Sequence, residues 1–162
     1  MKTAIYPGTF DPITFGHIDV IKKSLKIFDR VVIGTTDNVN KDYYFSIDER
    51  LSIINNSLFK DLKLNKKRIK VVAFDTLTIN LCKKYNASVI VRGLRAVSDF
   101  EYEFQLAGMN KKLSSNVETI FLMSDVENQI ISSKFVKEIA NLGGNIERFV
   151  TKYAVKMLKD KF

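Results

Sequence analysis

The chain has 162 residues, of which 46% are hydrophobic, and its 26 Lys and Arg against 18 Asp and Glu give a formal net charge of +8. This length and hydrophobic content predict one domain, residues 1–162, with a single buried core, so no second domain is needed. The positive charge predicts an anionic partner, although charge alone does not separate nucleic acid from phosphorylated small molecules.

The single cysteine and the lack of long apolar segments bear on where the protein works. Cys82 has no partner for an internal disulfide, suits a reducing cytoplasm, and is expected to be a core thiol without a catalytic role. No signal peptide precedes the first strand, and no apolar run reaches the length of a membrane span. We therefore expect a cytoplasmic protein without a membrane partner.

Strand and helix patterns alternate along the whole chain. Strands are predicted near 2–6 and at Arg30–Thr36, Ile69–Phe74, Ser88–Arg92 and Val117–Met123. Helices are predicted at 17–28, 47–59, about 77–85 and about 99–114, followed by two closing helices. This alternation predicts an α/β fold, a Rossmann-like, doubly wound parallel sheet of five strands with helices on both faces.

Local signals support two of these boundaries. Ser46-Ile47-Asp48-Glu49 is a capping box, which predicts the start of the second helix. Gly143-Gly144 is predicted to end the penultimate helix, because glycine suits the residue that follows a helix.

The stretch Tyr6–His17 contains both prolines of the chain and its single histidine. It follows an apolar run and precedes apolar residues at helical spacing, which predicts a strand-to-helix turn of the kind where α/β sheets place their chemistry. Its prolines stiffen the turn, its glycines allow close approach of a ligand, and Thr14 is the expected N-cap. His17 then lies in the first helical turn, where it can donate a hydrogen bond to a phosphoryl oxygen. The alternative is a histidine that only caps or packs.

Basic residues follow two further predicted strands. Lys41 lies in the loop before the capping box and, taken alone, is an ordinary exposed lysine. Arg92-Gly93-Leu94-Arg95 leaves the carboxyl end of the fourth strand, and the planar fork of arginine suits phosphate. The alternative is that these arginines pair with acidic residues of the next helix, namely Asp99, Glu101 or Glu103. In a doubly wound sheet the strand order reverses between the first and fourth strands, so the two anion-binding segments would face each other across one crevice.

Helices near the C-terminus carry further candidates. The helix Asp99–Asn110 has four apolar residues expected in the core or at a subunit contact, which are Phe100, Phe104, Leu106 and Met109. The segment Ile131–Ala140 begins a helix with serines in its first turn, which suits phosphate, although serine caps are common. The last helix is expected to be amphipathic with a solvated basic face formed by Lys152, Lys156, Lys159 and Lys161.

Three of these segments resemble one known family. Thr14-Phe15-Gly16-His17 matches the T/H-x-G-H signature of the adenylyl- and cytidylyltransferase superfamily. The longer stretch Tyr6–His17 resembles the bacterial phosphopantetheine adenylyltransferases, and the segments Arg92–Asn110 and Ile131–Ala140 resemble the same family in the same order. The resemblance covers nearly the whole chain. It implies a homohexameric enzyme of coenzyme A biosynthesis that joins ATP and 4'-phosphopantetheine to give dephospho-coenzyme A and pyrophosphate.

The resemblance also implies roles for individual residues. The implied catalytic residues are His17, Lys41, Thr9 and Arg92. The implied ATP contacts are Thr9, Phe10, His17, Gly93, Leu94, Arg95, Glu103, Asn128, Gln129, Ile130, Ile131, Ser132, Ser133 and Lys134. The implied contacts to the acceptor substrate are Thr9, Lys41, Thr78 and Arg92.

The implied cofactor is Mg²⁺ held mainly by the ATP phosphates, since no dedicated carboxylate cage is visible and no protein metal site is expected. Coenzyme A is an implied feedback inhibitor. The sequence departs from the family pattern at residues 42–44 and 128–129, and Lys134 stands where the family has a third serine.

Two other functions remain open at this point. One is another nucleotidyltransferase, with a nicotinamide nucleotide or a glycerol phosphate as acceptor. The other is a non-catalytic module that binds nucleotide or RNA in the same crevice, although no RNA-binding aromatic motif, zinc-finger spacing or Arg/Gly tract is present. The tetrad Thr14–His17 together with Lys41 and Arg92 favours catalysis, because binding alone does not require that combination. No nucleic acid partner is therefore expected.

Overall fold

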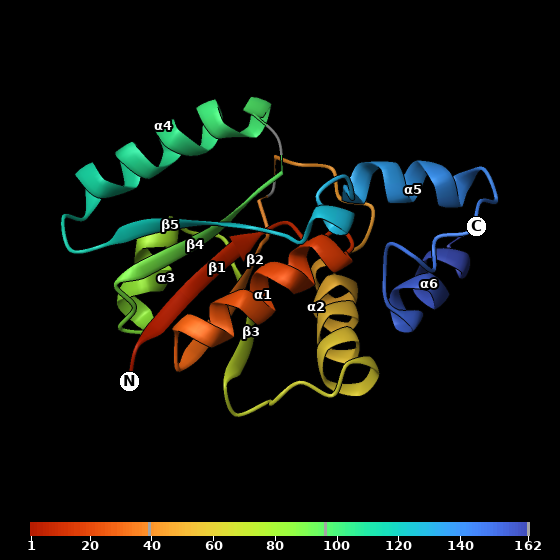
Figure 1. Cartoon of the computed structure of the whole chain (residues 1–162), viewed down its shortest axis with the longest axis horizontal. Helices are drawn as coiled ribbons and strands as arrows, with labels where there is room; N and C mark the ends of the chain where they lie inside the picture. Colours follow the sequence, from red (N-terminus) through yellow and green to blue (C-terminus); the bar gives the residue numbers. More distant parts are fainter. Residues whose placement is uncertain (39, 96, 162) are drawn as a thin grey trace.

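The computed structural model describes residues 1–38, 40–95 and 97–161, with only the backbone of Val97 and Ser98. Five parallel strands form one sheet in the order β3-β2-β1-β4-β5, which confirms the predicted doubly wound sheet (Figure 1). The strands are β1 Thr3–Gly8, β2 Arg30–Thr36, β3 Ile69–Phe74, β4 Val89–Leu94 and β5 Glu118–Met123. Since β1 and β4 are neighbours, the chain reverses its direction across the sheet between them.

Helices cover both faces of this sheet (Figure 1). The α-helices are α1 Phe15–Ile27, α2 Ile47–Asn55, α3 Thr78–Lys84, α4 Val97–Leu113, α5 Ser133–Asn141 and α6 Lys152–Lys159. A π-helix, η1 Asn56–Asp61, continues α2, and a 3-10 turn, η2 Val126–Asn128, precedes α5. Among the described residues, no helix is both long enough and apolar enough to cross a membrane.

The buried core has two parts, one on each face of the sheet. The larger part joins β1 and β2 with α1, α2 and α6, and contains Ile21, Ile53 and Leu158. The smaller part lies under α3 and contains Cys82, which is fully buried as predicted. Burial raises the pKa of the Cys82 thiol to about 11, so the thiol stays protonated and unreactive at neutral pH.

The predicted strands β2 and β3 match the structure at both ends, whereas two strands near the cleft extend further than predicted. β1 runs to Gly8, and Pro7 therefore lies in the strand opposite Gly34 rather than in the turn. β4 runs to Leu94, because Gly93 and Leu94 pair with the end of β5. The structure therefore corrects the prediction that Gly93 and Leu94 leave the sheet.

The helix predicted at 47–59 is wrong in its second half, because α2 ends at Asn55 and the chain widens into the π-helix η1. The side-chain amides of Asn55 and Asn56 donate to the carbonyls of Leu51 and Ser52, which an α-helix reserves for backbone N–H groups. The start of α2 matches, since Ser46 and Glu49 form the predicted capping box.

The structure also tests three predictions about the C-terminal half of the chain. Gly143 has a φ of 75° and its N–H donates to the carbonyl of Ala140, which confirms the predicted end of α5. Three of the α4 residues predicted for the core or a subunit contact are exposed in this chain, which excludes the core for Phe100, Phe104 and Met109. The four lysines of the predicted basic face are exposed, as that prediction requires, and the ammonium of Lys161 also donates to the carbonyl of Tyr44 and pairs with Glu49.

Candidate active site

A cleft of about 540 Å³ lies at the carboxyl edge of the sheet, where β1 and β4 are neighbours. This is the position at which an open α/β sheet binds its ligand. Most residues that sequence reasoning assigned to the site line this cleft, namely Thr9, Phe10, His17, Lys41, Arg92, Gly93, Leu94, Arg95, Glu103, Ile131, Ser132, Ser133 and Lys134. Segments far apart in the sequence therefore meet in one place.

His17 is held in one tautomer at the start of α1. The backbone N–H of Thr14 donates to Nδ1 of His17 at 3.0 Å, and the Thr14 hydroxyl lies 3.1 Å from the same nitrogen. Since Nδ1 accepts a hydrogen bond, the neutral ring carries its proton on Nε2. Burial, together with the positive charges of Arg95 and Arg92, lowers the pKa of His17 to about 4. His17 therefore caps α1 with one ring nitrogen and carries its proton on the other, Nε2, while a hydrogen bond from Nε2 to a phosphoryl oxygen remains a prediction.

The backbone before His17 is also constrained. Phe10 has a φ of 49°, a left-handed conformation that is uncommon for residues other than glycine. Its ring contacts the edges of both Tyr6 and His17, with centroid distances of 5.3 and 5.1 Å. A Cβ on Gly8 would lie only 2.8 Å from the Phe10 ring, so Gly8 makes room for this ring, and Gly8 also lines the cleft. Phe10 thus fixes the plane of the histidine from one side.

Arg92 crosses from β4 to β1, and each of its three side-chain nitrogens donates one hydrogen bond. Its Nε and Nη2 donate to the two carboxylate oxygens of Glu103 at 2.7 and 2.5 Å, and its Nη1 donates to the carbonyl of Pro7 at 2.8 Å. Arg95 pairs with Asp99 at 3.4 Å. The ion-pair alternative is therefore correct for both arginines, and both still line the cleft. Glu103, assigned to ATP by resemblance, uses both carboxylate oxygens to hold Arg92.

The loop that carries Lys41 is anchored by a buried carboxylate. Asp11 accepts hydrogen bonds from the backbone N–H groups of Tyr44 at 2.8 Å and Phe45 at 2.9 Å, and it pairs with Lys137 of α5 at 3.2 Å. Lys41 itself is exposed at the rim. Sequence reasoning missed both Asp11 and Lys137. Sequence patterns do not reveal these contacts, because they join residues more than 30 positions apart. The position of Asp11 inside the segment Tyr6–His17 was the one available signal.

Arg50 is a further residue that sequence reasoning missed. Its side chain is fully buried and donates to groups on both the first loop and the Lys41 loop. A signal was present in the sequence, because Arg50 lies three and four positions before the buried Ile53 and Ile54 and so places a charge on the apolar face of α2.

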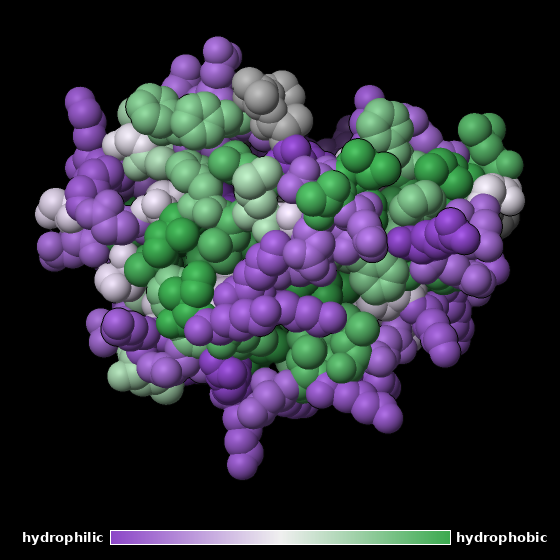
Figure 2. All heavy atoms as spheres, viewed as in Figure 1, coloured by the Kyte–Doolittle hydropathy of each residue, from purple (hydrophilic) through white to green (hydrophobic). Residues whose placement is uncertain are grey.

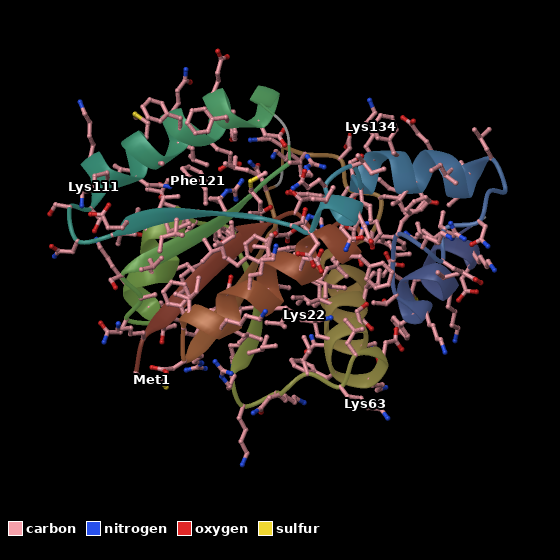
Figure 3. The ribbon with its side chains drawn as sticks, in the orientation of Figure 1. Met1, Lys22, Lys63, Lys111, Phe121 and Lys134 are labelled. Atoms are coloured by element: carbon pink, nitrogen blue, oxygen red, sulfur yellow. The ribbon has the colours of Figure 1, made fainter. Side chains whose placement is uncertain are left out.

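The start of α5 forms the other wall of the cleft. The hydroxyl of Ser132 accepts from the N–H of Phe135 at 3.1 Å, which caps the helix, and the hydroxyl of Ser133 donates to the carbonyl of Pro12 at 2.8 Å. Lys134 projects from the first turn and is exposed (Figure 3). In the part of the chain that the structure describes, Lys134 forms no ion pair with a carboxylate.

Four residues assigned by resemblance do not line the cleft. The amide of Asn128 donates to Asp19 of α1 at 2.6 Å, and that of Gln129 donates to the carbonyl of Ser124. Ile130 is 82% exposed, and Thr78 is the first residue of α3. Ligand contacts by these four residues, Thr78, Asn128, Gln129 and Ile130, remain predictions.

The described residues contain no group of three or more His, Cys, Asp or Glu that would hold a metal ion. Four carboxylates of the described chain line the cleft: those of Asp11, Asp99 and Glu103 are each paired with a Lys or an Arg, and the fourth is that of the exposed Asp42. Three of the cleft carboxylates are thus already engaged by cations of the chain.

Comparison with known proteins places the chain in a family. Residues 5–139 match the model of the cytidylyltransferase-like family. A protein of Pelagibacter ubique named phosphopantetheine adenylyltransferase is 65% identical over 161 residues, which cover 99% of this chain and 98% of that protein. A protein of Rhizorhabdus wittichii with the same name is 51% identical over 156 residues, covering 96% of this chain and 92% of the relative.

A solved structure supports the fold independently. The crystal structure of a putative nicotinate-nucleotide adenylyltransferase from Vibrio parahaemolyticus matches 98% of this chain and 91% of its own chain, with a TM-score of 0.71 and 20% identity. At this identity the match concerns the fold alone. It confirms the Rossmann-like architecture in which the cleft is formed.

Proposed function

The chain belongs to the phosphopantetheine adenylyltransferases of the cytidylyltransferase-like family, and from this premise we infer that it transfers the adenylyl group of ATP to 4'-phosphopantetheine. The products are dephospho-coenzyme A and pyrophosphate, so the enzyme acts in coenzyme A biosynthesis. The observation that carries this function is the single cleft, because it joins the T/H-x-G-H turn to the basic side chains of β4 and α5.

We propose an in-line displacement without a covalent enzyme intermediate. An oxygen of the acceptor phosphate attacks the α-phosphorus of ATP, a new P–O bond forms, and the bond to the β-phosphate breaks to release pyrophosphate. The protein positions the two substrates and stabilises the negative charge that develops at phosphorus. Nε2–H of His17 is suited to this task, because the fixed tautomer directs a donor away from Thr14 at neutral pH.

Three residues are proposed to bind the acceptor phosphate. In this proposal Thr9 positions the attacking oxygen, while Lys41 and Arg92 neutralise charge that would otherwise oppose the approach of two phosphates. The bonds from Arg92 to Glu103 and Pro7 support a positioned guanidinium, which loses little freedom when the substrate binds.

The polyphosphate of ATP is proposed to lie toward α5. Arg95, Ser132 and Ser133 line that side, and the exposed N–H groups at a helix start attract anions. Mg²⁺ would be held by the phosphate oxygens, and when bound it neutralises charge on the departing pyrophosphate. Feedback inhibition by coenzyme A is proposed at the same cleft, since that molecule contains both substrate halves.

The proposal also covers the oligomeric state of the protein and its place in the cell. We propose a homohexamer in the cytoplasm, and the support is an apolar surface over α4 and along β5 (Figure 2). Tyr102, Phe104 and Met109 of α4 are 65%, 63% and 60% exposed, and exposed apolar groups that gather on one face mark interaction sites. Light scattering of the purified protein should give six chain masses, whereas a monomer would contradict this part.

Pyrophosphate release with ATP and a panel of acceptors tests the reaction. The rate should require both ATP and 4'-phosphopantetheine. An equal rate with nicotinamide mononucleotide, or with glycerol phosphate and CTP, would favour another nucleotidyltransferase. Nucleotide binding without any turnover would favour the non-catalytic module.

A further inference from the structure

Arg50 is the largest fully buried side chain of the protein, and its charge is shared among several acceptors. Its Nε donates to the carbonyl of Phe45 at 3.1 Å, and its Nη1 donates to the carbonyls of Thr9 at 3.1 Å and Thr36 at 2.7 Å. Its Nη2 donates to the carboxylate of Asp37 at 3.2 Å. One guanidinium therefore contacts four separate chain positions.

These acceptors lie on two segments that both carry site residues. Thr36, Asp37 and Phe45 stand at the two ends of the loop that carries Lys41, and the guanidinium also lies 3.9 Å from the ring centroid of Tyr43 within that loop. The remaining acceptor is the carbonyl of Thr9 on the first loop. Arg50 thus bridges the Lys41 loop and the Thr9 backbone.

We propose that Arg50 is a positioning residue that sets the distance between Thr9 and Lys41, and thereby the geometry of the acceptor phosphate site. The proposal rests on the proposed function, in which both residues bind that phosphate. Arg50 has no contact with solvent, so it acts through these two residues and not on substrate.

The chemistry of arginine explains why this position needs it. The planar fork offers five donors in fixed directions, whereas a lysine ammonium is a compact group with three donors that cannot reach four separate acceptors. The carbonyl of Thr9 precedes Phe10, whose left-handed backbone is strained, and the hydrogen bond from Arg50 helps to hold this turn. Loss of the fork leaves carbonyls unpaired and removes one of the two links that the described residues form between the loops, the other being Asp11, which accepts from two backbone N–H groups at the end of the Lys41 loop.

The chain offers a matched control in Arg68. Arg68 immediately precedes β3, at the amino edge of the sheet, and it also donates to backbone carbonyls, those of Leu25, Phe28 and Asp29. It is absent from the wall of the cleft. Arg50→Lys and Arg68→Lys therefore make the same chemical change at opposite edges of the sheet.

Steady-state kinetics separate positioning from packing. Arg50→Lys should raise the KM for 4'-phosphopantetheine roughly tenfold or more and leave the KM for ATP within about twofold, because a small displacement of positioning groups weakens one substrate site. Arg68→Lys should lower the melting temperature and change neither KM. Equal changes of both KM values in Arg50→Lys, or no change in either, would overturn the proposal.

Trypsin cleavage after Lys41 gives a readout that does not depend on activity. Arg50→Lys should be cut there several times faster than wild type under native conditions, while Arg68→Lys should be cut at the wild-type rate. Equal rates in Arg50→Lys and wild type would overturn the proposal even if the enzyme proves to use another acceptor.

If Arg50→Lys does not fold, Asp37→Asn is the second variant, because it removes the negative charge of one hydrogen-bond acceptor of Arg50 with little change in shape. It should raise the KM for 4'-phosphopantetheine and the rate of cleavage after Lys41, each by less than Arg50→Lys would.

Discussion

Two helices begin at the cleft, and they offer a ligand different things. α1 starts at the Thr14 cap with His17 in its first turn, and that imidazole is partly buried, neutral and held by a backbone N–H. α5 starts at the Ser132 cap with Lys134 in its first turn, and that ammonium is exposed to water. Part of each helix end is already paired, because the N–H of the first residue of α1 donates to the carbonyl of Phe149 and the N–H of the third residue of α5 donates to the hydroxyl of Ser132.

The difference separates two ways to bind phosphate. A donor fixed inside the protein needs no reorganisation when charge develops at phosphorus, so it contributes mainly in the transition state. An exposed charge attracts the anion before reaction, and salt screens it. We therefore expect changes at the start of α1 to lower kcat strongly. Changes at the start of α5 should weaken ATP binding by a smaller factor.

The largest expected effect is that of His17→Ala. Loss of the Nε2 donor should lower kcat by roughly a hundredfold or more while the KM for ATP changes little. Rapid-quench and steady-state assays measure both quantities. A variant with normal kcat and a reduced melting temperature would show that His17 only caps α1. The start of α1 would then have no special role in the transition state.

A variant of Lys41 tests whether an exposed charge on a loop, away from both helix starts, also contributes to substrate binding. Lys41→Ala should lower kcat/KM for 4'-phosphopantetheine by roughly tenfold or more, since the variant loses a charge next to the acceptor phosphate. Lys156→Ala on the exposed side of α6 is the control and should leave kinetics unchanged. A loss of activity in the control would instead indicate a general effect of positive charge.

The pH dependence sharpens the description of the α1 end. The pKa of His17 is about 4 in the folded protein and near 6.5 in the unfolded chain, so the unfolded chain binds more protons between these values. His17 should therefore lower the free energy of unfolding as the pH falls through this window, by about 1–2 kcal/mol at pH 5. Urea unfolding of wild type and His17→Asn at pH 7 and pH 5 measures this difference. Parallel changes in the two proteins would contradict a neutral, partly buried imidazole.

The smallest expected effect is at the α5 end. Lys134→Ser should raise the KM for ATP roughly two- to fivefold at low ionic strength, and the effect should shrink at high salt, as expected for an exposed charge contact. The variant should also be slightly more stable, because a cation at a helix start opposes the helix dipole. An unchanged KM for ATP at low salt with a raised melting temperature would show that Lys134 points only into solvent.

Much of the fold and part of the site followed from local sequence patterns. The period of apolar residues gave β2 and β3 at both ends, and the cap residues Ser46 and Thr14 marked two helix starts. The order of strands followed from the alternation of strands and helices, since right-handed crossovers leave few topologies. The T/H-x-G-H tetrad identified the turn that forms the cleft, because a strand, a turn and a helix start are encoded within a dozen residues.

The tertiary structure decided how the site residues are held. Sequence could name Glu103 and Arg92 as alternatives for ligand or ion pair, but the spacing of a strand and the next helix determined that they meet. The roles of Asp11, Arg50 and Lys137 depend on side chains that reach carbonyls, N–H groups and charges up to 126 positions away. Hydrophobic period and caps describe contacts within one turn or one strand, whereas these groups find their partners only when separate elements pack together.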